Sequence, residues 1–264
     1  MKSITSRDNP RYKEMRQLAS SAQARKKAGK TILDGVHLCD AYFDHISAKA
    51  IMIVSESGMR MSEVVPLVAR AEDCGSEVIC LPDALYAVLS QVENGVPVAL
   101  LIDTPVCAMP DRLHDTVVLL DGVQDPGNLG SILRSAAAAE IQHVICGQGT
   151  VAAWSPKVLR AGMGAHFLLR IHSRVDLAQW RSGYQEKLWA TALSGRPQNL
   201  YAMALAEPAA WLFGNEGSGV SAAALALADG SVHIPMAGAT ESLNVAMAAT
   251  VCLFEQMRQR MQAV

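Results

Sequence analysis

The chain has 264 residues, of which 50% are hydrophobic, 18% are charged and 5% are aromatic, and its formal net charge is −2. This length is enough to bury a core in one large domain or two ordinary ones, and the apolar fraction excludes a disordered protein. The longest uncharged stretch runs from Ile141 to Pro156 and is too short and too polar to span a membrane.

The N-terminus and the cysteines predict where the protein works. The first residues, MKSITSRDNP, have no apolar core behind Lys2, so no signal peptide is expected. Six cysteines are scattered along the chain without a CxxC pair, which argues against a zinc site and for reduced thiols. We therefore expect a soluble cytoplasmic protein with no bound metal and no membrane association.

The small net charge hides an asymmetry between the two ends of the chain. Residues 1–30 contain nine Lys or Arg against Asp8 and Glu14, a net charge of +7, whereas the remaining residues sum to −9. Charge alone leaves two interpretations open. The basic segment is either an arm that contacts phosphates, as in a nucleic acid, or a solvated helix face.

In the first part of the chain, short apolar runs alternate with helical patterns, which is typical of an α/β protein. A basic helix is expected over residues 10–29, and further helices at 36–45, 61–74 and 84–91. Strands are expected at 31–33, 50–55, 77–81 and 96–102. The segment from Asp103 to Thr116 has two prolines and no apolar period, so we predict a linker there.

The alternation resumes after this linker. Strands are expected at 117–120, 143–146, 167–171, 188–192, 211–213 and 232–234, and helices at 128–139, 156–162, 175–180, 220–228 and 242–262. Six strands that alternate with helices predict a mostly parallel six-stranded sheet with helices on both faces. In such sheets ligands bind beyond the carboxyl ends of the strands, so the loops there are where chemistry is expected.

The loop after the strand at 117–120 reads DGVQDPGNLG and runs into SILR. Its Pro-Gly pair predicts a tight turn, and Asn128 is a candidate N-cap. Arg134 follows Asn128 by six residues and lies among apolar residues and alanines. If Arg134 points inward it needs an acidic or phosphate partner; the alternative is an exposed arginine on an amphipathic helix.

Two more loops of unusual composition follow later strands. LFGNEGSGV places three glycines around Glu216, but it is neither a P-loop nor GxGxxG, so a nucleotide-phosphate site is not favoured. IPMAGATESLNVA places Ser242 and Asn244 at a helix start, where capping explains only one of them. An apolar wall suited to a flat heterocycle would be formed by Ile234, Pro235 and Leu243.

Taken together, the three loops resemble the motifs of the SpoU/TrmH-type RNA ribose methyltransferases of the SPOUT superfamily. The resemblance covers residues 117–262 through DPGNLGSILRSA, LFGNEGSGVS and IPMAGATESLNVAMA, in that order, and SPKVLRAGMGA at 155–165 is similar to a further family segment. Residues 1–105 resemble, more loosely, the family's L30e-like substrate-binding domain, with Asp34 in place of the usual Glu in ILDGVH. Two departures, Glu140 for a glycine and Gly162 for a small hydroxyl residue, bear on substrate detail rather than on the reaction.

The resemblance implies a fold and a set of partners. The fold is a catalytic α/β domain at 117–264 whose C-terminal part threads through a loop as a trefoil knot, preceded by a linker at 106–116 and a smaller α/β L30e-like domain at 1–105. The partners are a second copy in a homodimer and S-adenosylmethionine as methyl donor. The cofactor-binding residues that it assigns are Gly214, Ile234, Pro235, Met236 and Leu243, with Thr191, Ala192 and Leu193 beside them. The basic N-terminal segment would then bind RNA phosphates. The candidate RNA-binding residues are Arg7, Arg11, Arg25, Lys26, Lys27 and His37.

The resemblance also implies methyl transfer to a ribose 2′-OH in structured RNA, with ribosomal RNA favoured over tRNA because of the added N-terminal domain. The catalytic residues that it assigns are Asn128, Arg134, Glu216, Ser242 and Asn244. A guanidinium is always protonated in proteins, so a phosphate clamp or a stabiliser of the developing 2′-oxyanion suits Arg134 better than the role of general base given to it in the family. Glu216 either orients this arginine or places a negative charge at a helix N-terminus.

Two other classes of function are weighed against this one. An RNA- or ribosome-binding protein that has lost catalysis would not need all five of the assigned catalytic residues intact. A Rossmann-type methyltransferase or dehydrogenase needs a glycine fingerprint after an early strand with an acidic residue about 20 positions further on, and the chain has none. The lone GQG at 147–149 is not followed by a matching helix.

Overall fold

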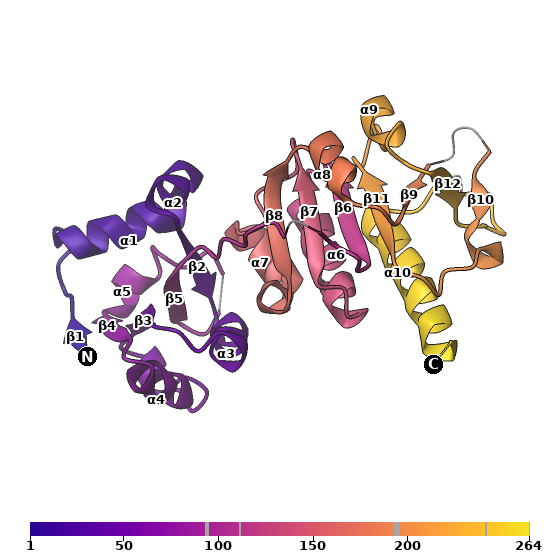
Figure 1. The fold of residues 1–264 in the computed structure, drawn as a ribbon. Helices are drawn as coiled ribbons and strands as arrows, with labels where there is room; N and C mark the ends of the chain where they lie inside the picture. The colour runs from indigo at the N-terminus through magenta and orange to yellow at the C-terminus, as the bar shows by residue number, and fades with distance from the viewer. Residues whose placement is uncertain (93–94, 111, 193–195, 241, 264) are drawn as a thin grey trace. The chain divides into compact units, whose positions relative to one another are not determined.

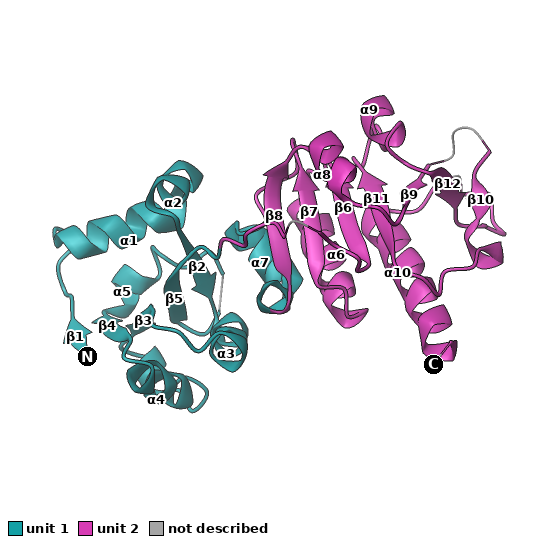
Figure 2. Cartoon of the chain, in the orientation of Figure 1, with its two compact units in different colours: residues 1–105, 154–167 teal, residues 106–153, 168–264 magenta. Residues whose placement is uncertain are grey.

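A computed structural model describes residues 1–92, 95–110, 112–192, 196–240 and 242–263, which form two compact units (Figures 1 and 2). One unit holds residues 1–105 and 154–167, and the other holds residues 106–153 and 168–264. The segment 154–167, which the sequence places in the second half, packs with the first unit because Leu159 is buried in that unit's core. No helix in the described part of the chain is long and apolar enough to cross a membrane.

The first unit is built on a mixed sheet with the strand order β1-β4-β3-β5-β2. Its strands are β1 (Lys2–Ser3), β2 (Lys30–Asp34), β3 (Ile51–Ser55), β4 (Glu77–Leu81) and β5 (Val98–Asp103). Only β5 runs against its neighbours, and it pairs with both β2 and β3. Alternate residues of β3 point into two different cores, Met52 on one face of the sheet and Ile53 on the other, because successive side chains of a strand point to opposite faces.

Helices cover both faces of this sheet. The core around Met52 is closed by α3 (Val36–His45), α4 (Val65–Asp73) and α7 (Pro156–Gly162), and the core around Ile53 by α1 (Pro10–Ser20) and α5 (Asp83–Tyr86). The predicted helix over 10–29 is interrupted at Ser21, whose extended backbone and side-chain bond from the Ala24 amide, at 3.2 Å, start the separate helix α2 (Ala22–Ala28). No residue of α2 is fully buried, and Ala24 packs, partly buried, against the core around Ile53.

The second unit is a parallel sheet, with the order β10-β12-β9-β11-β6-β7-β8 among the described residues. Its strands are β6 (Val117–Asp121), β7 (His143–Gly147), β8 (Arg170–Val175), β9 (Lys187–Thr191), β10 (Gln198–Asn199), β11 (Ala209–Gly214) and β12 (Gly230–His233). The sequence predicts six of these seven strands; it misses β10, which has two exposed residues and therefore no apolar run. The strand predicted at 167–171 begins later, because the 3₁₀ helix η2 (Ala165–Leu168) occupies its first part.

Helices lie on both faces of this sheet as well. Trp180 of α8 (Leu177–Gly183) and Ala224 of α9 (Ala222–Leu225) join Leu212 of β11 in one core. Trp211 points to the opposite face, where its indole N–H donates to Gln256 of α10 (Val245–Gln262) at 2.6 Å. The helix α6 (Pro126–Ala138) packs against α10, so α6 and α10 together bring two of the three motif loops to the same side.

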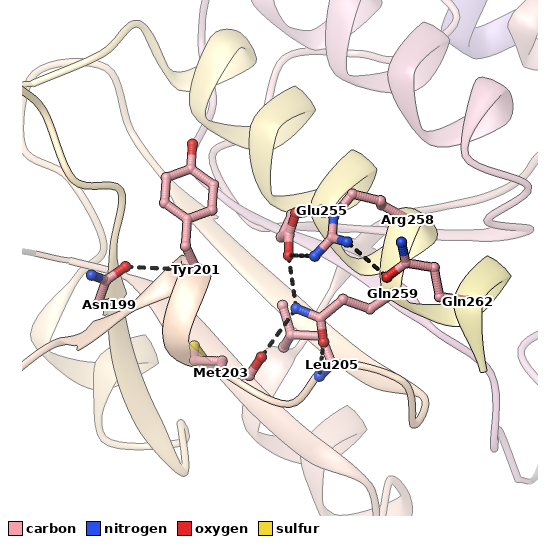
Figure 3. Close-up of polar contacts among 8 residues, drawn as sticks. All are labelled: Asn199, Tyr201, Met203, Leu205, Glu255, Arg258, Gln259 and Gln262. Carbon is pink, nitrogen blue, oxygen red and sulfur yellow. Dashed lines mark hydrogen bonds and ion pairs between the residues drawn. The ribbon is translucent and has the colours of Figure 1, made fainter.

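The C-terminal half of α10 forms hydrogen bonds with the segment that links the short helix η3 (Leu200–Ala202) to β11 (Figure 3). Gln259 donates to the carbonyl of Met203 at 3.0 Å and accepts from the amide of Leu205 at 2.8 Å. A hydrogen bond from Arg258 is the main reason that the pKa of Glu255 falls to about 2, and the Glu255 carboxylate also accepts from Gln259. These bonds fix the path of the chain into β11, the strand that precedes the turn holding Glu216.

Two buried histidines lie side by side on β7 and β8. His143 Nδ1 and His172 Nε2 are 3.1 Å apart, and the rings are stacked with centroids 5.4 Å apart. Burial is the main cause that lowers the pKa of both rings, and the neighbouring Arg170 adds to it, whereas Asp115 opposes it for His143 and a hydrogen bond with the backbone of Cys107 opposes it for His172. The pair therefore stays neutral in the folded protein at neutral pH.

This pair predicts a loss of stability in mild acid. Since an unfolded histidine titrates near a pKa of about 6.5, the unfolded chain binds protons below that pH that the folded pair does not. The free energy of unfolding should therefore be at its full value above pH about 7 and fall as the pH drops through 6.5, by up to about 1.4 kcal/mol per pH unit for each histidine. Urea unfolding followed by tryptophan fluorescence between pH 7.5 and 5.5 measures this slope.

A control variant separates the histidine pair from other titrating groups. His172→Gln keeps a polar side chain at this position but removes one titrating ring, so it should roughly halve the slope. Equal free energies of unfolding at pH 7.5 and 5.5 in the unmodified protein would show that the pair is not held neutral.

Candidate functional site

The carboxyl ends of four neighbouring strands meet at one edge of the second unit's sheet. The strands β12, β9, β11 and β6 are adjacent and parallel, so the loops that follow them leave from the same side. The loops after β6 and β11 and the start of α10 carry the residues that the sequence singles out. The structure thus brings positions as far as 116 residues apart in the chain to one place (Figure 1).

The loop after β6 begins α6 with an unexpected cap. Asp125, and not Asn128 as the sequence suggests, is the N-cap: its carboxylate accepts from the backbone amide of Asn128 at 2.8 Å. Pro126 follows at the first helical position, where a missing N–H costs nothing. Because Asp125 caps the helix, the amide side chain of Asn128 is free to bond elsewhere.

The loop after β11 is a tight turn. The backbones of Asn215 and Gly219 exchange two hydrogen bonds of 2.9 Å, which brings the returning chain against the end of β11. A Cβ on Gly214 would lie 2.1 Å from backbone atoms of Gly219 and Val220, so only glycine fits there. The need for glycine at 214 therefore comes from the turn itself, and the turn holds Glu216 at its tip.

Glu216 joins the two loops through its carboxylate. It accepts from the backbone amides of Gln124, at 3.1 Å, and Asp125, at 3.0 Å, and from the side chain of Asn128, at 3.0 Å. Partial burial opposes ionisation, but these hydrogen bonds outweigh it and hold the pKa of Glu216 below its usual range. Glu216 is therefore a carboxylate at neutral pH whose oxygens are occupied by donors from the loop after β6.

Asn244 adds the third motif to this network. Its Oδ1 accepts from the amides of Ala246 and Met247, at 2.9 and 3.3 Å, which makes it the N-cap of α10. Its Nδ2 donates to Asn128 Oδ1 at 2.9 Å. A chain of hydrogen bonds therefore runs from the start of α10 through Asn244 and Asn128 to Glu216.

Arg134 and Ser242 are the two assigned catalytic residues that this network does not include. Arg134 is exposed on α6, and its side chain makes no hydrogen bond or ion pair with the residues that the structure describes. Ser242 is likewise exposed and unbonded to the described residues. Glu216 thus makes no ion pair with Arg134; its partners are amides, and the guanidinium is left available to a substrate anion.

The residues assigned to the cofactor come from three adjacent strand ends and, for Leu243, from the segment just before α10. Thr191 ends β9 and donates to the carbonyl of Leu212 at 3.2 Å, and Ala192 donates from its amide to Val232 at 3.3 Å. Leu243 exposes 40% of its surface. The other residues of this set are Gly214 at the end of β11 and Ile234, Pro235 and Met236 after β12, whereas Leu193 lies outside the described residues. Apolar side chains that are not covered, beside backbone donors and acceptors, fit a ligand with a flat ring such as the adenine of S-adenosylmethionine.

The residues assigned to RNA all belong to the first unit, and the structure divides them. Arg11 pairs with Glu77 at 2.9 Å, and Arg25 donates to the carbonyls of Leu18 and Ala19 at 2.7 and 3.1 Å, where it caps the end of α1. Burial lowers the pKa of Arg25. The exposed side chains without a partner among the described residues are Arg7, Lys26, Lys27 and His37.

Sequence reasoning missed three parts of the site. The amides of Gln124 and Asp125 hold Glu216, and backbone donors leave no trace in residue type. Asn215 links the two loops by donating to the carbonyl of Gly122 at 2.8 Å. The Asp-Pro pair at 125–126 is a recognisable helix start and is the signal that identifies Asp125 rather than Asn128 as the cap.

Comparison with known proteins agrees with this geometry. The model of the SpoU rRNA Methylase family matches residues 115–254, which include all three motif loops. The chain is 31% identical over 261 residues to the 23S rRNA (guanosine(2553)-2′-O)-methyltransferase RlmP of Bacillus subtilis, covering 96% of this chain and 98% of that protein.

Solved structures show the same similarity. An AdoMet-bound rRNA methyltransferase from Sinorhizobium meliloti matches with a TM-score of 0.84 and 27% identity, covering 97% of both chains. A structure concerned with the 2-OH methylation of C/U34 on tRNA has a TM-score of 0.51 and 28% identity, and it covers 56% of this chain and 98% of its own.

Proposed function

The chain belongs to the SpoU rRNA Methylase family, and we propose that it transfers a methyl group from S-adenosylmethionine to a ribose 2′-OH of ribosomal RNA at the edge formed by β12, β9, β11 and β6. The observation that carries this proposal is the hydrogen-bond chain that joins Asn244, Asn128 and Glu216, because it assembles all three motifs into one site. The site is thereby held in place before a substrate arrives.

S-adenosylmethionine supplies an electrophilic sulfonium methyl group. The protein must then bind the cofactor, align a hydroxyl with that methyl group and stabilise the charge that develops on the oxygen. Ile234, Met236 and Leu243 would pack against the adenine, and the backbone beyond Thr191 and Gly214 would provide polar contacts.

The role of Arg134 follows from its charge and its lack of partners. A guanidinium does not lose its proton at physiological pH, so Arg134 serves to bind the RNA phosphate and to stabilise the developing 2′-oxyanion. Glu216 keeps its oxygens turned to the loop after β6 and thereby fixes the side chain of Asn128 in the first turn of α6. Ser242 is assigned to the same site as a further polar contact with substrate.

Ribosomal RNA is the favoured substrate class. RlmP of Bacillus subtilis and the Sinorhizobium meliloti structure, which match nearly the whole chain, are described as acting on rRNA, whereas the tRNA-related structure corresponds to only 56% of it. The family model matches residues 115–254 and leaves residues 1–114 outside it. We therefore assign residues 1–105 to an L30e-like RNA-binding domain and residues 117–264 to the catalytic domain, joined by the linker at 106–116, in a cytoplasmic protein.

The basic face of α2 is proposed to contact RNA through Lys26 and Lys27. Replacing both with alanine should weaken RNA binding and make the logarithm of affinity fall less steeply with the logarithm of salt, by a slope of roughly 1.5 for two lost phosphate contacts. Filter binding or fluorescence anisotropy at several salt concentrations measures both quantities. Arg25→Ala should instead destabilise the fold, since Arg25 bonds to Leu18 and Ala19.

The matched control for the Lys26/Lys27 variant is Arg60→Ala. Arg60 lies in η1 (Gly58–Arg60) after the carboxyl end of β3, whereas α2 leads into the amino end of the parallel strand β2. Its removal should leave the salt slope unchanged. An unchanged slope in the Lys26/Lys27 variant would show that these lysines are only solvated charges.

A homodimer is proposed through an exposed apolar stripe on α10. Met247, Phe254 and Met261 recur every seven residues and expose 52%, 38% and 71% of their surfaces. Such a stripe on one helix face suits a second copy of the same helix. Light scattering should give twice the chain mass at micromolar concentration and a single chain mass for Met247→Asp/Phe254→Asp. Val106→Asp, at another exposed apolar residue, should stay dimeric, and a monomeric unmodified protein would contradict the proposal.

A trefoil knot in the C-terminal part is also proposed. It is supported by the path of the chain, which leaves β12 at one side of the sheet and returns past β9 and β11 to place α10 against α6. A knotted chain should refold slowly after full unfolding, and a circularised unfolded chain should not acquire the knot. Equally fast and complete refolding of the linear and circularised chains would contradict it.

Transfer of labelled methyl groups to RNA tests the function itself. Total RNA from a strain that lacks this gene is incubated with the protein and radiolabelled S-adenosylmethionine, and then separated by size. Label should appear in large ribosomal RNA, and RNA from the parent strain, already modified, should accept little. Label confined to tRNA would overturn the substrate class, and a protein that neither binds the cofactor nor transfers label would favour a non-catalytic RNA-binding protein.

A further inference from the structure

Asn215 uses its side chain to join the two loops that meet at Glu216. Its Oδ1 accepts from the amides of Gly217, at 2.9 Å, and Ser218, at 3.1 Å, which closes the turn on itself. Its Nδ2 points the other way and donates to the carbonyl of Gly122, at 2.8 Å. Nδ2 also lies 3.4 Å from Glu216 Oε2. One side chain thus shapes the turn and ties it to the loop after β6.

The second end of the turn is tied to the same loop. The amide of Ser221 donates to Asp121 Oδ2 at 2.7 Å. The carbonyl that accepts from Asn215 belongs to Gly122, which has a φ of +72°. Residues with a side chain rarely adopt this left-handed conformation. Glu216 therefore lies on a turn that is hydrogen-bonded to this loop at both ends. Of the two residues that make these bonds, Asn215 is the nearer to Glu216 in the chain.

From this arrangement we propose that Asn215 is a positioning residue for methyl transfer: its Nδ2 donor to Gly122 keeps the Glu216 carboxylate against the amides of Gln124 and Asp125 and the side chain of Asn128. The inference rests on the role proposed above for Glu216 and deepens it. Asn215 touches neither reacting group and acts through Glu216. The Nδ2 donor of the Asn215 amide carries this role, and its Oδ1 acceptor shapes the turn.

The variant Asn215→Asp separates these two halves. An aspartate keeps the acceptor for Gly217 and Ser218, so the turn is retained, but it has no donor for Gly122 and repels the neighbouring carboxylate. Asn215→Asp should lower kcat at least about tenfold, leave the KM for S-adenosylmethionine within about twofold and change the Tm little. Asn215→Ala should lower kcat similarly and also lower the Tm.

Asn199 provides a matched control in the same unit. Its Oδ1 accepts from the amide of Tyr201 at 2.9 Å, the same kind of local turn, on the edge strand β10, which pairs with β12 and not with β11 or β6 (Figure 3). Asn199→Asp should therefore leave kcat unchanged. Normal kcat in Asn215→Asp as well would mean that the side chain only shapes a turn, and the inference would be wrong.

A double-mutant cycle with Glu216→Gln tests whether Asn215 acts through Glu216. If it does, the double variant Asn215→Asp/Glu216→Gln should be no slower than Glu216→Gln alone, because the second change removes what the first disturbs. Effects on kcat that multiply would overturn the inference while leaving the proposed function intact. An unchanged kcat in Glu216→Gln alone would instead contradict the proposed role of Glu216, on which the inference depends.

Discussion

Replacing Arg134 with alanine should lower the kcat of methyl transfer by about 100- to 1000-fold, the range found when one preorganised donor to a developing oxyanion is removed. Binding of S-adenosylmethionine should stay within about twofold, because the residues that fit the cofactor lie on other elements. The Tm should hardly change, since the Arg134 side chain is exposed and bonds to no other residue that the structure describes. Single-turnover transfer and calorimetric cofactor binding measure the two effects separately.

Two further variants sharpen this expectation. Arg134→Lys keeps the charge but loses the planar fork, so it should recover only part of the rate. Arg170→Ala removes another exposed arginine, at the amino end of β8 and so at the opposite edge of the sheet, and should leave the rate intact. Full activity in Arg134→Ala would remove Arg134 from the reaction.

Replacing Gly214 with alanine should damage both stability and activity. Its Cβ would be placed 2.1 Å from backbone atoms of Gly219 and Val220, and backbone cannot turn aside as a flexible side chain can. Relieving the overlap must move the turn and withdraw Glu216 from its donors. We expect a loss of about 3 kcal/mol in the free energy of unfolding, at the upper end for overpacking, and at least about a hundredfold loss of kcat.

Gly217→Ala is the control within the same turn. Nothing lies closer than 3.6 Å to a Cβ at Gly217, and the contact there is the Asn215 side chain. This variant should fold normally and keep its rate within about threefold. Comparable damage from both substitutions would mean that the whole turn, rather than the close approach at Gly214, is intolerant of change.

The sequence predicts the longer sheet strands of both units because buried strands appear as apolar runs, but it misses the two-residue strand β1 as well as β10. It fails where a local contact decides the outcome. The break at Ser21 depends on a single side-chain cap, and β10 is too short to leave a pattern. The placement of 154–167 depends on where Leu159 is buried, and neither composition nor periodicity changes at 154 to mark it.

The candidate site was predictable to the extent that side chains define it. Asn128, Glu216 and Asn244 stand after strand ends or at a helix start, and a parallel sheet brings such positions to one edge, where the structure joins them by hydrogen bonds. The partners of Glu216 were not predictable in the same way, since two of them are backbone amides. The orientation of Arg25 was also hidden, because charge alone does not distinguish a phosphate contact from a helix cap.

The chemistry of the methylated product tests the central claim most directly. Ribosomal RNA labelled by the protein from radiolabelled S-adenosylmethionine is hydrolysed completely with alkali, which cleaves only next to a free 2′-OH. Methyl transfer to a ribose predicts that the label is recovered in an alkali-resistant dinucleotide. Label recovered in mononucleotides would place the methyl group on a base and would contradict the account given for this site.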